Sequence, residues 1–207
     1  MYSVLETKRL VLKPLQENDF DNMFKIASNP KIIETMEWVF MDDPKVYKKE
    51  FIKQVNSGAY FTINKKKTDD FMGFFILWNY TDKKKCKIKY SQLVTALLPK
   101  YWNHGFCTEV TEKIIHFAFI GIKTPWICAN QSLTNHAAGK ILQKCGFTYY
   151  AKMDKGTNDQ YRYIREDYLK NKSIDILKNE NIYNYIFPID LFNNSSKNII
   201  QKWAGEK

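Results

Sequence analysis

The sequence has no long uncharged apolar run and nothing that resembles a targeting segment. No stretch of its 207 residues reaches the roughly 18 consecutive apolar residues that a membrane-spanning helix needs. The opening MYSVLETKRL lacks the apolar core that follows a basic start in a secretory signal. We therefore expect a cytoplasmic protein with no membrane partner.

Closely paired cysteines are also missing. The four cysteines, Cys86, Cys107, Cys128 and Cys145, are widely spaced, and no two form a Cys-x-x-Cys pair. Cysteine-based zinc sites use such close pairs, and disulfides form in oxidising compartments. We expect free thiols and no metal site.

Arginine is scarce although the chain is strongly basic. The net charge is +10, but the only arginines are Arg9, Arg162 and Arg165, and lysine supplies the rest. A positive field favours an acidic partner such as RNA, the ribosome or an anionic cofactor. Surfaces built to bind phosphate favour the planar fork of arginine, however, and an AT-rich coding sequence also yields many Lys, Asn and Ile residues. Both explanations stay open, and under either one the charge favours an anionic ligand.

The chain does contain enough apolar material for one large domain. Hydrophobic residues make up 44% of it and aromatic residues 15%, which suffices for a core. Apolar positions with a period of two predict strands, and those that share one helical face predict helices. The predicted strands are 8–15, 59–67, 71–80, 86–98, 125–130, 147–153 and 159–169, and the predicted helices are 16–29, 44–57, 108–120 and 135–145.

The order of these elements predicts the fold class. Charged turns after the second and third strands suit antiparallel hairpins. The strand 86–98, the helix 108–120 and the strand 125–130 follow one another directly, which requires a right-handed parallel crossover. We expect an α/β (α+β) fold with a mixed, mostly antiparallel sheet flanked by helices and a central β-α-β crossover. Residues 1–169 would form this domain, and the apolar clusters within 170–207 would pack on it or on a second copy, as in a homodimer.

The sharpest local signal is LLPKYWNHGFCTEV, residues 97–110. A strand ends at Pro99, a short loop contains Gly105, and a helix begins near Thr108 with Glu109 in its first turn. Backbone N–H groups at such a junction, with the positive end of the helix dipole, bind anions, and pyrophosphate is a common occupant. A single glycine before a helix also occurs in ordinary turns, so this junction alone leaves both interpretations open.

Four segments, taken in order, carry a family resemblance. They are ETKRLVLKPLQENDFDNMF, LLPKYWNHGFCTEV, NHAAGKILQKCGF and YRYIREDYL, within residues 5–169. Together they are similar to the GNAT superfamily of N-acetyltransferases, in particular to the bacterial branch that acetylates the N-termini of ribosomal proteins (Rim type). The resemblance implies the GNAT fold and acetyl-CoA as the acetyl donor.

The resemblance also implies which residues bind the cofactor. The family's Gln/Arg-x-x-Gly-x-Gly/Ala loop falls on 102–107, where Trp102 replaces Gln/Arg and Cys107 stands at the Gly/Ala position as a small filler rather than a nucleophile. Ala138 stands where this branch often carries serine, so one hydroxyl that would assist the leaving thiolate is absent. The implied cofactor-binding residues are Leu97 and Leu98 (through their backbone), Asn103, His104, Gly105, Phe106, Cys107, Thr108, Asn135 and Ala138.

The family's usual acid and base positions are weakened in this chain. The glutamate that many members carry on the strand before the loop aligns with Gln92, which cannot take up a proton at neutral pH. The tyrosine acid of other members aligns with Leu142. Gln92 and Tyr150 are the remaining candidate catalytic residues, although a tyrosine at position 150 also fits core packing.

These observations support one leading interpretation and two alternatives. The leading one is acetyl transfer from acetyl-CoA to a primary amine by direct attack, the acceptor being a protein N-terminus, a lysine or a small amine. The first alternative is a toxin-like GNAT that acetylates aminoacyl-tRNA, which the positive charge favours. The second is a non-catalytic acyl-CoA-binding module, which the vacant acid and base positions favour. The expected partner is the amine acceptor, with the ribosome or tRNA as further candidates.

Overall fold

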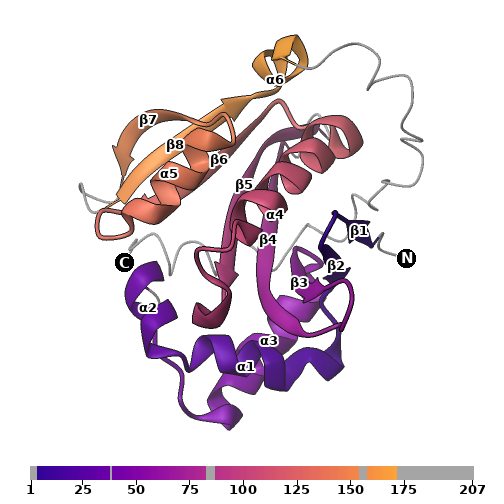
Figure 1. Cartoon of the computed structure of the whole chain (residues 1–207), viewed down its shortest axis with the longest axis vertical. Coiled ribbons are helices and arrows are strands. Elements are labelled where there is room, and N and C mark those ends of the chain that lie inside the picture. Colours follow the sequence, from indigo (N-terminus) through magenta and orange to yellow (C-terminus); the bar gives the residue numbers. More distant parts are fainter. Residues whose placement is uncertain (1–3, 38, 83–86, 154–157, 172–207) are drawn as a thin grey trace.

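A single eight-stranded sheet organises the chain (Figure 1). The computed structural model describes residues 4–37, 39–82, 87–153 and 158–171. The sheet order is β1-β2-β3-β4-β5-β6-β8-β7, and all neighbours are antiparallel except β5 and β6, which are parallel. The predicted mixed, mostly antiparallel sheet is therefore confirmed. The strands are β1 (Leu5–Glu6), β2 (Leu10–Pro14), β3 (Tyr60–Lys65), β4 (Phe71–Asp82), β5 (Lys87–Leu97), β6 (Trp126–Ser132), β7 (Thr148–Met153) and β8 (Asn158–Ile164).

Helices connect these strands and flank the sheet. Three of them lie between β2 and β3 in the sequence, one joins β5 to β6, and one joins β6 to β7. In that order they are α1 (Phe20–Ala27), α2 (Pro30–Met36), α3 (Pro44–Ser57), α4 (Phe106–His116) and α5 (His136–Lys144). Short turns and a last helix complete the chain: η1 (Glu17–Asp19), η2 (Pro99–Tyr101), the π-helical turn η3 (Phe117–Ile122) and α6 (Arg165–Asn171). Within the described ranges, no helix is long and apolar enough to cross a bilayer.

Two apolar clusters hold the helices on opposite faces of the sheet, because neighbouring residues of a strand point to opposite sides. The first cluster packs α4, η3 and α5 on one face, through residues such as Val110, Ile114, Phe119 and Leu142 against Phe61, Phe75, Leu77 and Leu93. The second packs α1, α2 and α3 on the other face, through Met23, Ile26, Ile32, Tyr47 and Phe51 against Tyr60, Phe74, Ile76, Trp78 and Ala96. The second cluster contains no residue of β6, β7 or β8.

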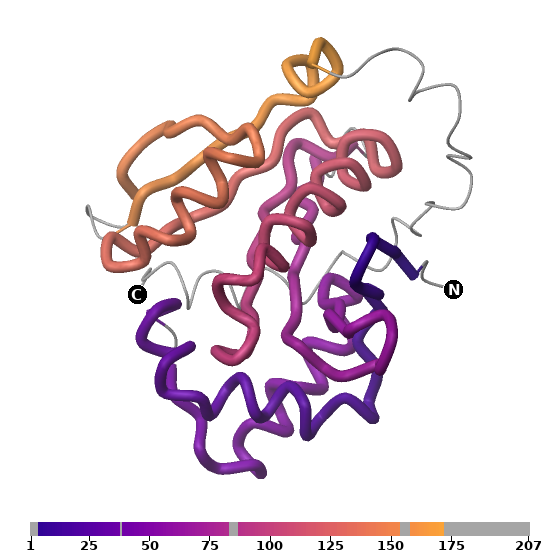
Figure 2. The backbone as a smooth tube through the Cα atoms, in the orientation of Figure 1, coloured from indigo at the N-terminus to yellow at the C-terminus, as the bar shows by residue number. Residues whose placement is uncertain are grey.

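β5 and β6 diverge after a short parallel contact. Only Ser91 with Ile127 and Gln92 with Cys128 are paired between them. Beyond that point β5 stays paired with β4 as far as Leu97, and β6 stays paired with β8 as far as Ser132. The two halves of the sheet therefore separate, as the backbone trace in Figure 2 shows.

The structure contains one helix, α2, that the sequence analysis did not predict. Pro30 is expected to end the first helix, but it also lies in the first turn of α2. The Asn29 side chain caps this helix by accepting the N–H of Ile32 at 3.3 Å. Because a first-turn N–H has no partner within the helix, proline costs nothing there, so one residue ends a helix and begins the next.

Some predicted boundaries are wrong. The predicted strand 159–169 ends at Ile164, and α6 follows with acidic residues in its first turn, where they favour the helix dipole. The predicted helix 108–120 does not end at Gly121. α4 continues into η3, which includes Gly121 and ends at Lys123, a residue with a left-handed backbone and φ of 60°. α6 crosses the predicted domain boundary at 169 and includes residues 170 and 171. The rest of the predicted extension 170–207, with its predicted packing on the domain or on a second copy, lies outside the described residues.

Candidate active site

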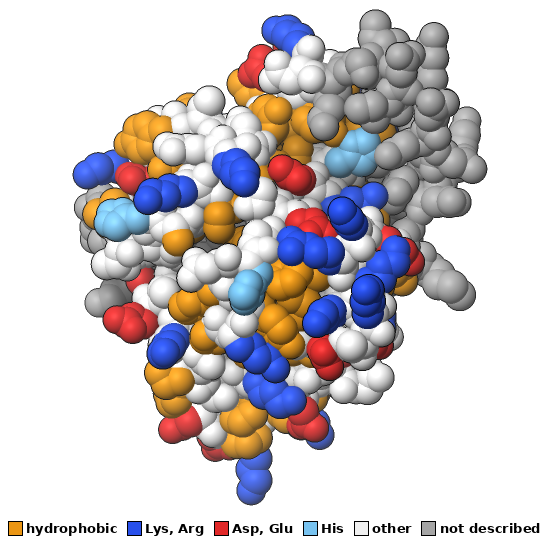
Figure 3. All heavy atoms as spheres, in the orientation of Figure 1, with side chains coloured by type: hydrophobic (Ala, Val, Ile, Leu, Met, Phe, Trp, Pro, Cys, Tyr) orange, Lys and Arg blue, Asp and Glu red, His pale blue; other side chains and the backbone are white. Residues whose placement is uncertain are grey.

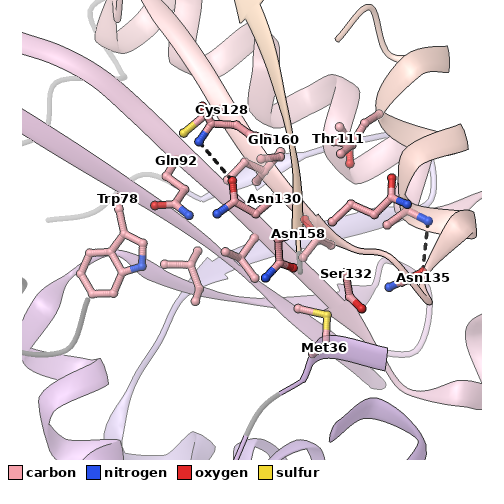
Figure 4. A pocket seen from close by; sticks show the side chains of 18 of the residues that line it. Met36, Trp78, Gln92, Thr111, Cys128, Asn130, Ser132, Asn135, Asn158 and Gln160 are labelled. Atoms are coloured by element: carbon pink, nitrogen blue, oxygen red, sulfur yellow. Dashed lines mark hydrogen bonds between the residues drawn. The ribbon is translucent and has the colours of Figure 1, made fainter. Parts of the chain in front are cut away.

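A cavity of about 880 Å³ lies where β5 and β6 diverge. Residues of α4 and α5 line it on one side of the sheet, and residues at the end of α2 line it on the other. Figure 4 shows the side chains that converge on this space. The strand residues in its lining include Tyr80, Gln92, Thr95, Asn130, Gln131 and Gln160.

The loop before α4 is shaped to present backbone N–H groups. Asn103 and Gly105 both have left-handed backbones, with φ of 62° and 74°, and Gly105 is the N-cap residue. The helix therefore begins at Phe106, two residues before its predicted start at Thr108. No side chain in the described part of the protein caps it, so its first-turn N–H groups lack an acceptor within the helix. Together with the helix dipole, these N–H groups can hold an anion such as a pyrophosphate.

An ion pair that the sequence analysis missed braces this loop. Arg9 Nε lies 2.6 Å from Glu109 Oε2, and Arg9 Nη1 donates to the carbonyl of His104 at 3.1 Å. The guanidinium carbon also lies 4.2 Å from the ring centroid of Phe106. Arg9 thus connects the start of β2 with both the loop and α4. The sequence feature that could have pointed to Arg9 is the scarcity of arginine, since it is one of only three in the chain.

Glu109 is held in its ionised form. Burial acts to raise the pKa of this carboxyl group, but hydrogen bonds from Thr7 Oγ1 and from Arg9, with the guanidinium charge, outweigh burial. The net result is a pKa below the usual value of 4.5. The carboxylate therefore balances the charge of Arg9 beside the loop.

Cys107 lines the cavity as a neutral thiol. Burial raises the pKa of this thiol to about 11, and the reactive form of cysteine is the thiolate. Burial likewise raises the pKa of Cys128, on β6, to about 12. Both thiols are therefore protonated at neutral pH, and we expect neither cysteine to act as a nucleophile.

The backbone groups of Leu97 and Leu98 are engaged within the protein. The carbonyl of Leu97 accepts a hydrogen bond from Trp102 Nε1 at 2.7 Å, and the N–H of Leu98 donates to the carbonyl of Met72 at 2.8 Å. The part of β5 that lines the cavity lies nearer the point of divergence and includes Leu93 and Thr95. Trp102 thus ties the loop to the end of β5.

Two buried polar atoms beside the cavity have no hydrogen-bond partner within the described part of the chain. They are Thr95 Oγ1 on β5 and Gln131 Oε1 on β6, and both residues line the cavity. Buried polar atoms are nearly always hydrogen-bonded, so this pair suits a ligand with complementary groups. The amide and hydroxyl groups of a pantetheine arm would fit that requirement.

The end of α2 meets the start of α5 across the cavity. Asn135 caps α5 by accepting the N–H of Ala138 at 3.2 Å, and its Nδ2 donates to the carbonyl of Thr35 at 3.2 Å. Ser132 Oγ donates to the carboxylate of Glu37, whose backbone is left-handed with φ of 52°. Asn135 and Ala138, both predicted to face the cofactor, line the cavity.

The two candidate catalytic residues lie in different places. Gln92 lines the cavity, and its Oε1 accepts a hydrogen bond from the phenol of Tyr80 at 2.9 Å. Burial raises the pKa of Tyr80, so the phenol stays protonated. Tyr150 is 55% exposed, and its ring centroid lies 3.2 Å from the guanidinium carbon of Arg162. The structure therefore places Gln92 in the cavity lining together with Tyr80, a residue that the sequence analysis did not single out. Tyr150 is not part of the lining, but it contacts Arg162, which is.

The positive net charge of the protein favours an anionic ligand, whereas the described residues offer no cluster of metal ligands. In the ranges that the structure describes, no group of His, Cys, Asp and Glu side chains could hold a metal. Figure 3 shows Lys and Arg side chains spread widely over the face that carries α4. Such a surface attracts anions towards the start of α4.

Sequence comparison defines the class of protein to which this site belongs. A model of the acetyltransferase (GNAT) domain matches residues 9–148. The chain is 25% identical over 169 residues to the uncharacterized N-acetyltransferase YoaA of Bacillus subtilis, covering 79% of this chain and 90% of YoaA. It is 24% identical over 156 residues to the uncharacterized N-acetyltransferase C18E5.08 of Schizosaccharomyces pombe, covering 70% and 83% of the two chains. The chain therefore belongs to the GNAT family of acetyltransferases, whose acetyl donor is acetyl-CoA.

Solved structures share the fold at low sequence identity. A GNAT-family acetyltransferase from Bacillus anthracis superposes with a TM-score of 0.69 at 14% identity, covering 79% of this chain and 99% of that one. Spermidine N-acetyltransferase from Vibrio cholerae, in complex with CoA and spermine, superposes with a TM-score of 0.67 at 15% identity, with the same coverage. These structures show that the fold is shared, and together with the sequence comparisons they give no evidence for the ribosomal-protein branch, or for the ribosome or tRNA as partners.

Proposed function

We propose that this acetyltransferase transfers the acetyl group of acetyl-CoA to a primary amine in the cavity between β5 and β6. The observation that supports this most is the divergence of the two strands directly after Gln92 and Cys128. The opening gives one continuous cavity, which extends from Cys107 and Thr111 of α4 to the polar face of β6 and β8. A donor and an acceptor can therefore approach one another from opposite sides of the sheet.

The α4 side of the cavity would hold the donor, which supplies an acetyl group activated as a thioester. The loop from Asn103 to Gly105 and the first-turn N–H groups of Phe106, Cys107 and Thr108 would bind its pyrophosphate. The exposed His104 lies in the same loop. Thr95 Oγ1 could donate a hydrogen bond to the arm that follows, and Gln131 Oε1 could accept one from it, beside Asn135 and Ala138.

The chemistry then depends on alignment. The acceptor amine attacks in its neutral form, its nitrogen bonds to the acetyl carbon, the carbon–sulfur bond breaks, and the released thiolate or water takes the amine proton. Gln92 cannot accept that proton, but its amide N–H can polarise the acetyl carbonyl while Tyr80 holds its oxygen. Holding two reactants in line supplies much of the acceleration that such a transfer needs. Tyr150 would act as an acid only from the edge of the cavity.

Calorimetric titration of the full chain with acetyl-CoA and with CoA tests the donor site, and release of free CoA thiol with a panel of primary amines tests the transfer. We expect micromolar binding of both ligands and thiol release that depends on the amine. Binding without release for any amine would instead favour a non-catalytic acyl-CoA-binding module. Absence of binding would show that the loop before α4 is only a turn.

A further inference from the structure

Amide side chains cover the cavity on the face of the sheet that bears α1 to α3. Gln92 of β5, Asn130 of β6 and Gln160 of β8 come from three neighbouring strands, and all three line the cavity. Figure 4 shows the amide nitrogens of Gln92 and Asn130 turned towards the space between them. An amide can present either a donor or an acceptor to a ligand, so its orientation decides what the cavity can bind.

Arg162 fixes the orientation of this group. Its Nε lies 3.0 Å from Gln160 Oε1, and because a guanidinium can only donate, the atom it meets must be the amide oxygen. The amide nitrogen of Gln160 therefore faces Asn130, 3.3 Å from Asn130 Oδ1. That contact occupies the oxygen of Asn130 and leaves its amide nitrogen as the free group.

The guanidinium of Arg162 is itself held in place by aromatic rings. Its central carbon lies 4.3 Å from the ring centroid of Trp126 and 3.2 Å from that of Tyr150. Trp126 in turn stacks on Tyr90 at 4.4 Å. A planar cation held by two rings has little freedom to rotate. The hydrogen bonds from Arg162 to Gln160 and from Gln160 to Asn130 therefore keep the same donor and acceptor atoms.

The cavity therefore presents N–H donors to the acceptor substrate. Gln92 has the same polarity, since the Tyr80 phenol occupies its oxygen at 2.9 Å. Among the described lining residues, Glu37 is the one carboxylate and Arg162 the one strong cation. Asn130 is exposed in the free protein, so a bound ligand without oxygen atoms would exclude water from its amide without pairing it, at a cost of about 1–3 kcal/mol once the ligand buries the group.

From this geometry, and given the proposed transfer to an amine, we infer that the acceptor is an amine with a carbonyl or carboxylate oxygen close to its nitrogen, and that Gln160 is the positioning residue that selects it. A polyamine does not match, because it offers only N–H donors and several positive charges to a cavity with a single carboxylate. The single carboxylate of Glu37 suits one ammonium group. The substrate class therefore differs from that in the name of the spermidine N-acetyltransferase that shares the fold.

The test compares acceptors of similar size at saturating acetyl-CoA. Alaninamide and alanine carry the oxygen, sec-butylamine lacks it, and spermidine represents the polyamines. Rates are expressed per neutral amine, so that differences in amine basicity do not enter. We expect kcat/KM for alaninamide or alanine to exceed that for sec-butylamine and spermidine by about 10-fold or more, and the better of the two shows whether the oxygen belongs to an amide or a carboxylate.

Two variants test the orientation itself. Gln160→Glu keeps the contact with Arg162 but removes the donor to Asn130, so the Asn130 amide can turn and present its oxygen. Asn130→Asp replaces the free donor directly, and because Asn130 is exposed, this variant should fold. We expect both to raise KM for the oxygen-bearing acceptor about 10-fold and to leave KM for acetyl-CoA unchanged. The matched control Gln143→Glu, with the same charge change on exposed α5, should alter neither.

The outcomes separate this inference from the proposed function. Equal or faster acetylation of spermidine or sec-butylamine would overturn the substrate class while leaving amine acetylation intact. Variants that lower kcat/KM for all acceptors alike would show a structural role for Gln160 and overturn its positioning role. Acetyl-CoA binding without acetylation of any amine would refute the proposed function, and the inference with it.

Discussion

The two sides of the cavity differ in the groups that they offer to a ligand. On the α4 side, the proposed anion site would consist of backbone N–H groups, with a left-handed glycine and a brace from Arg9 to Glu109. On the opposite side, recognition rests on amide side chains whose direction is set by Arg162. Backbone recognition suits a donor that every member of the family shares, whereas side-chain recognition can change the acceptor without disturbing the fold. Substitutions on the two sides should therefore have separable effects.

The largest effect is expected from a side chain in the anion loop. Gly105→Val places a branched residue at a φ of 74° where the pyrophosphate would approach, and should weaken acetyl-CoA binding about 100-fold, or about 3 kcal/mol. Gly58→Val is the matched control, because Gly58 also has a positive φ of 62° but caps α3. Calorimetry should show loss of binding in the first variant alone. Equal loss in both would mean that general strain, and not the loop, controls binding.

Next in size is the loss of the Gln92 amide, which we propose faces the acetyl group. Gln92→Leu removes the donor from β5 and should lower kcat about 10-fold, because polarisation of the carbonyl is lost. The dissociation constant for acetyl-CoA should stay the same, and Gln143→Leu on the exposed face of α5 should leave both quantities unchanged. If kcat for Gln92→Leu stayed at the native value, the amide would have no part in the transfer.

The brace beside the loop should contribute to stability in a pH-dependent way. The pKa of Glu109 is lower in the folded chain than its usual 4.5, so its ionised form stabilises the fold above that pH, and the contribution is lost as the pH falls towards the folded pKa. Glu109→Gln should therefore reduce the free energy of unfolding by about 1 kcal/mol at pH 7. Urea unfolding of both proteins from pH 7 to pH 3 should show this difference shrinking below pH 4.5. A difference that grows at low pH would contradict the assigned role.

The smallest effect is expected at the cysteine that lines the cavity. Cys107→Ala should keep kcat within about 2-fold of the native value, because a thiol with a pKa of about 11 is not a nucleophile at neutral pH. Initial rates at pH 7 and pH 9 provide the measurement. Abolished turnover in this variant, with acetyl-CoA binding retained, would point to a covalent intermediate on Cys107.

Most of the strand and helix order could be predicted from the sequence because it depends on local periodicity. The loop at Gly105 could be predicted for the same reason, because a glycine directly before an amphipathic helix indicates a turn. The missed helix α2 shows the limit of a local signal, because Pro30 fits both the end of one helix and the start of another.

The parts of the site that escaped prediction depend on contacts between distant segments. Arg9 and Glu109 are 100 residues apart, and the local sequence around either residue does not predict their contact. The direction of the Asn130 amide depends on Gln160 and Arg162, 30 and more residues away on another strand. The point at which β5 leaves β6 is likewise a property of the assembled sheet.

The most direct test of the two-sided account is one set of initial-rate measurements on the native chain, Gly105→Val and Gln160→Glu. KM for acetyl-CoA and the ratio of kcat/KM for alaninamide to that for spermidine would be measured for each protein. We expect Gly105→Val to raise KM for acetyl-CoA at an unchanged acceptor ratio, and Gln160→Glu to lower the acceptor ratio at an unchanged KM for acetyl-CoA. A variant that moved both quantities together would contradict the separation of donor and acceptor recognition across the cavity.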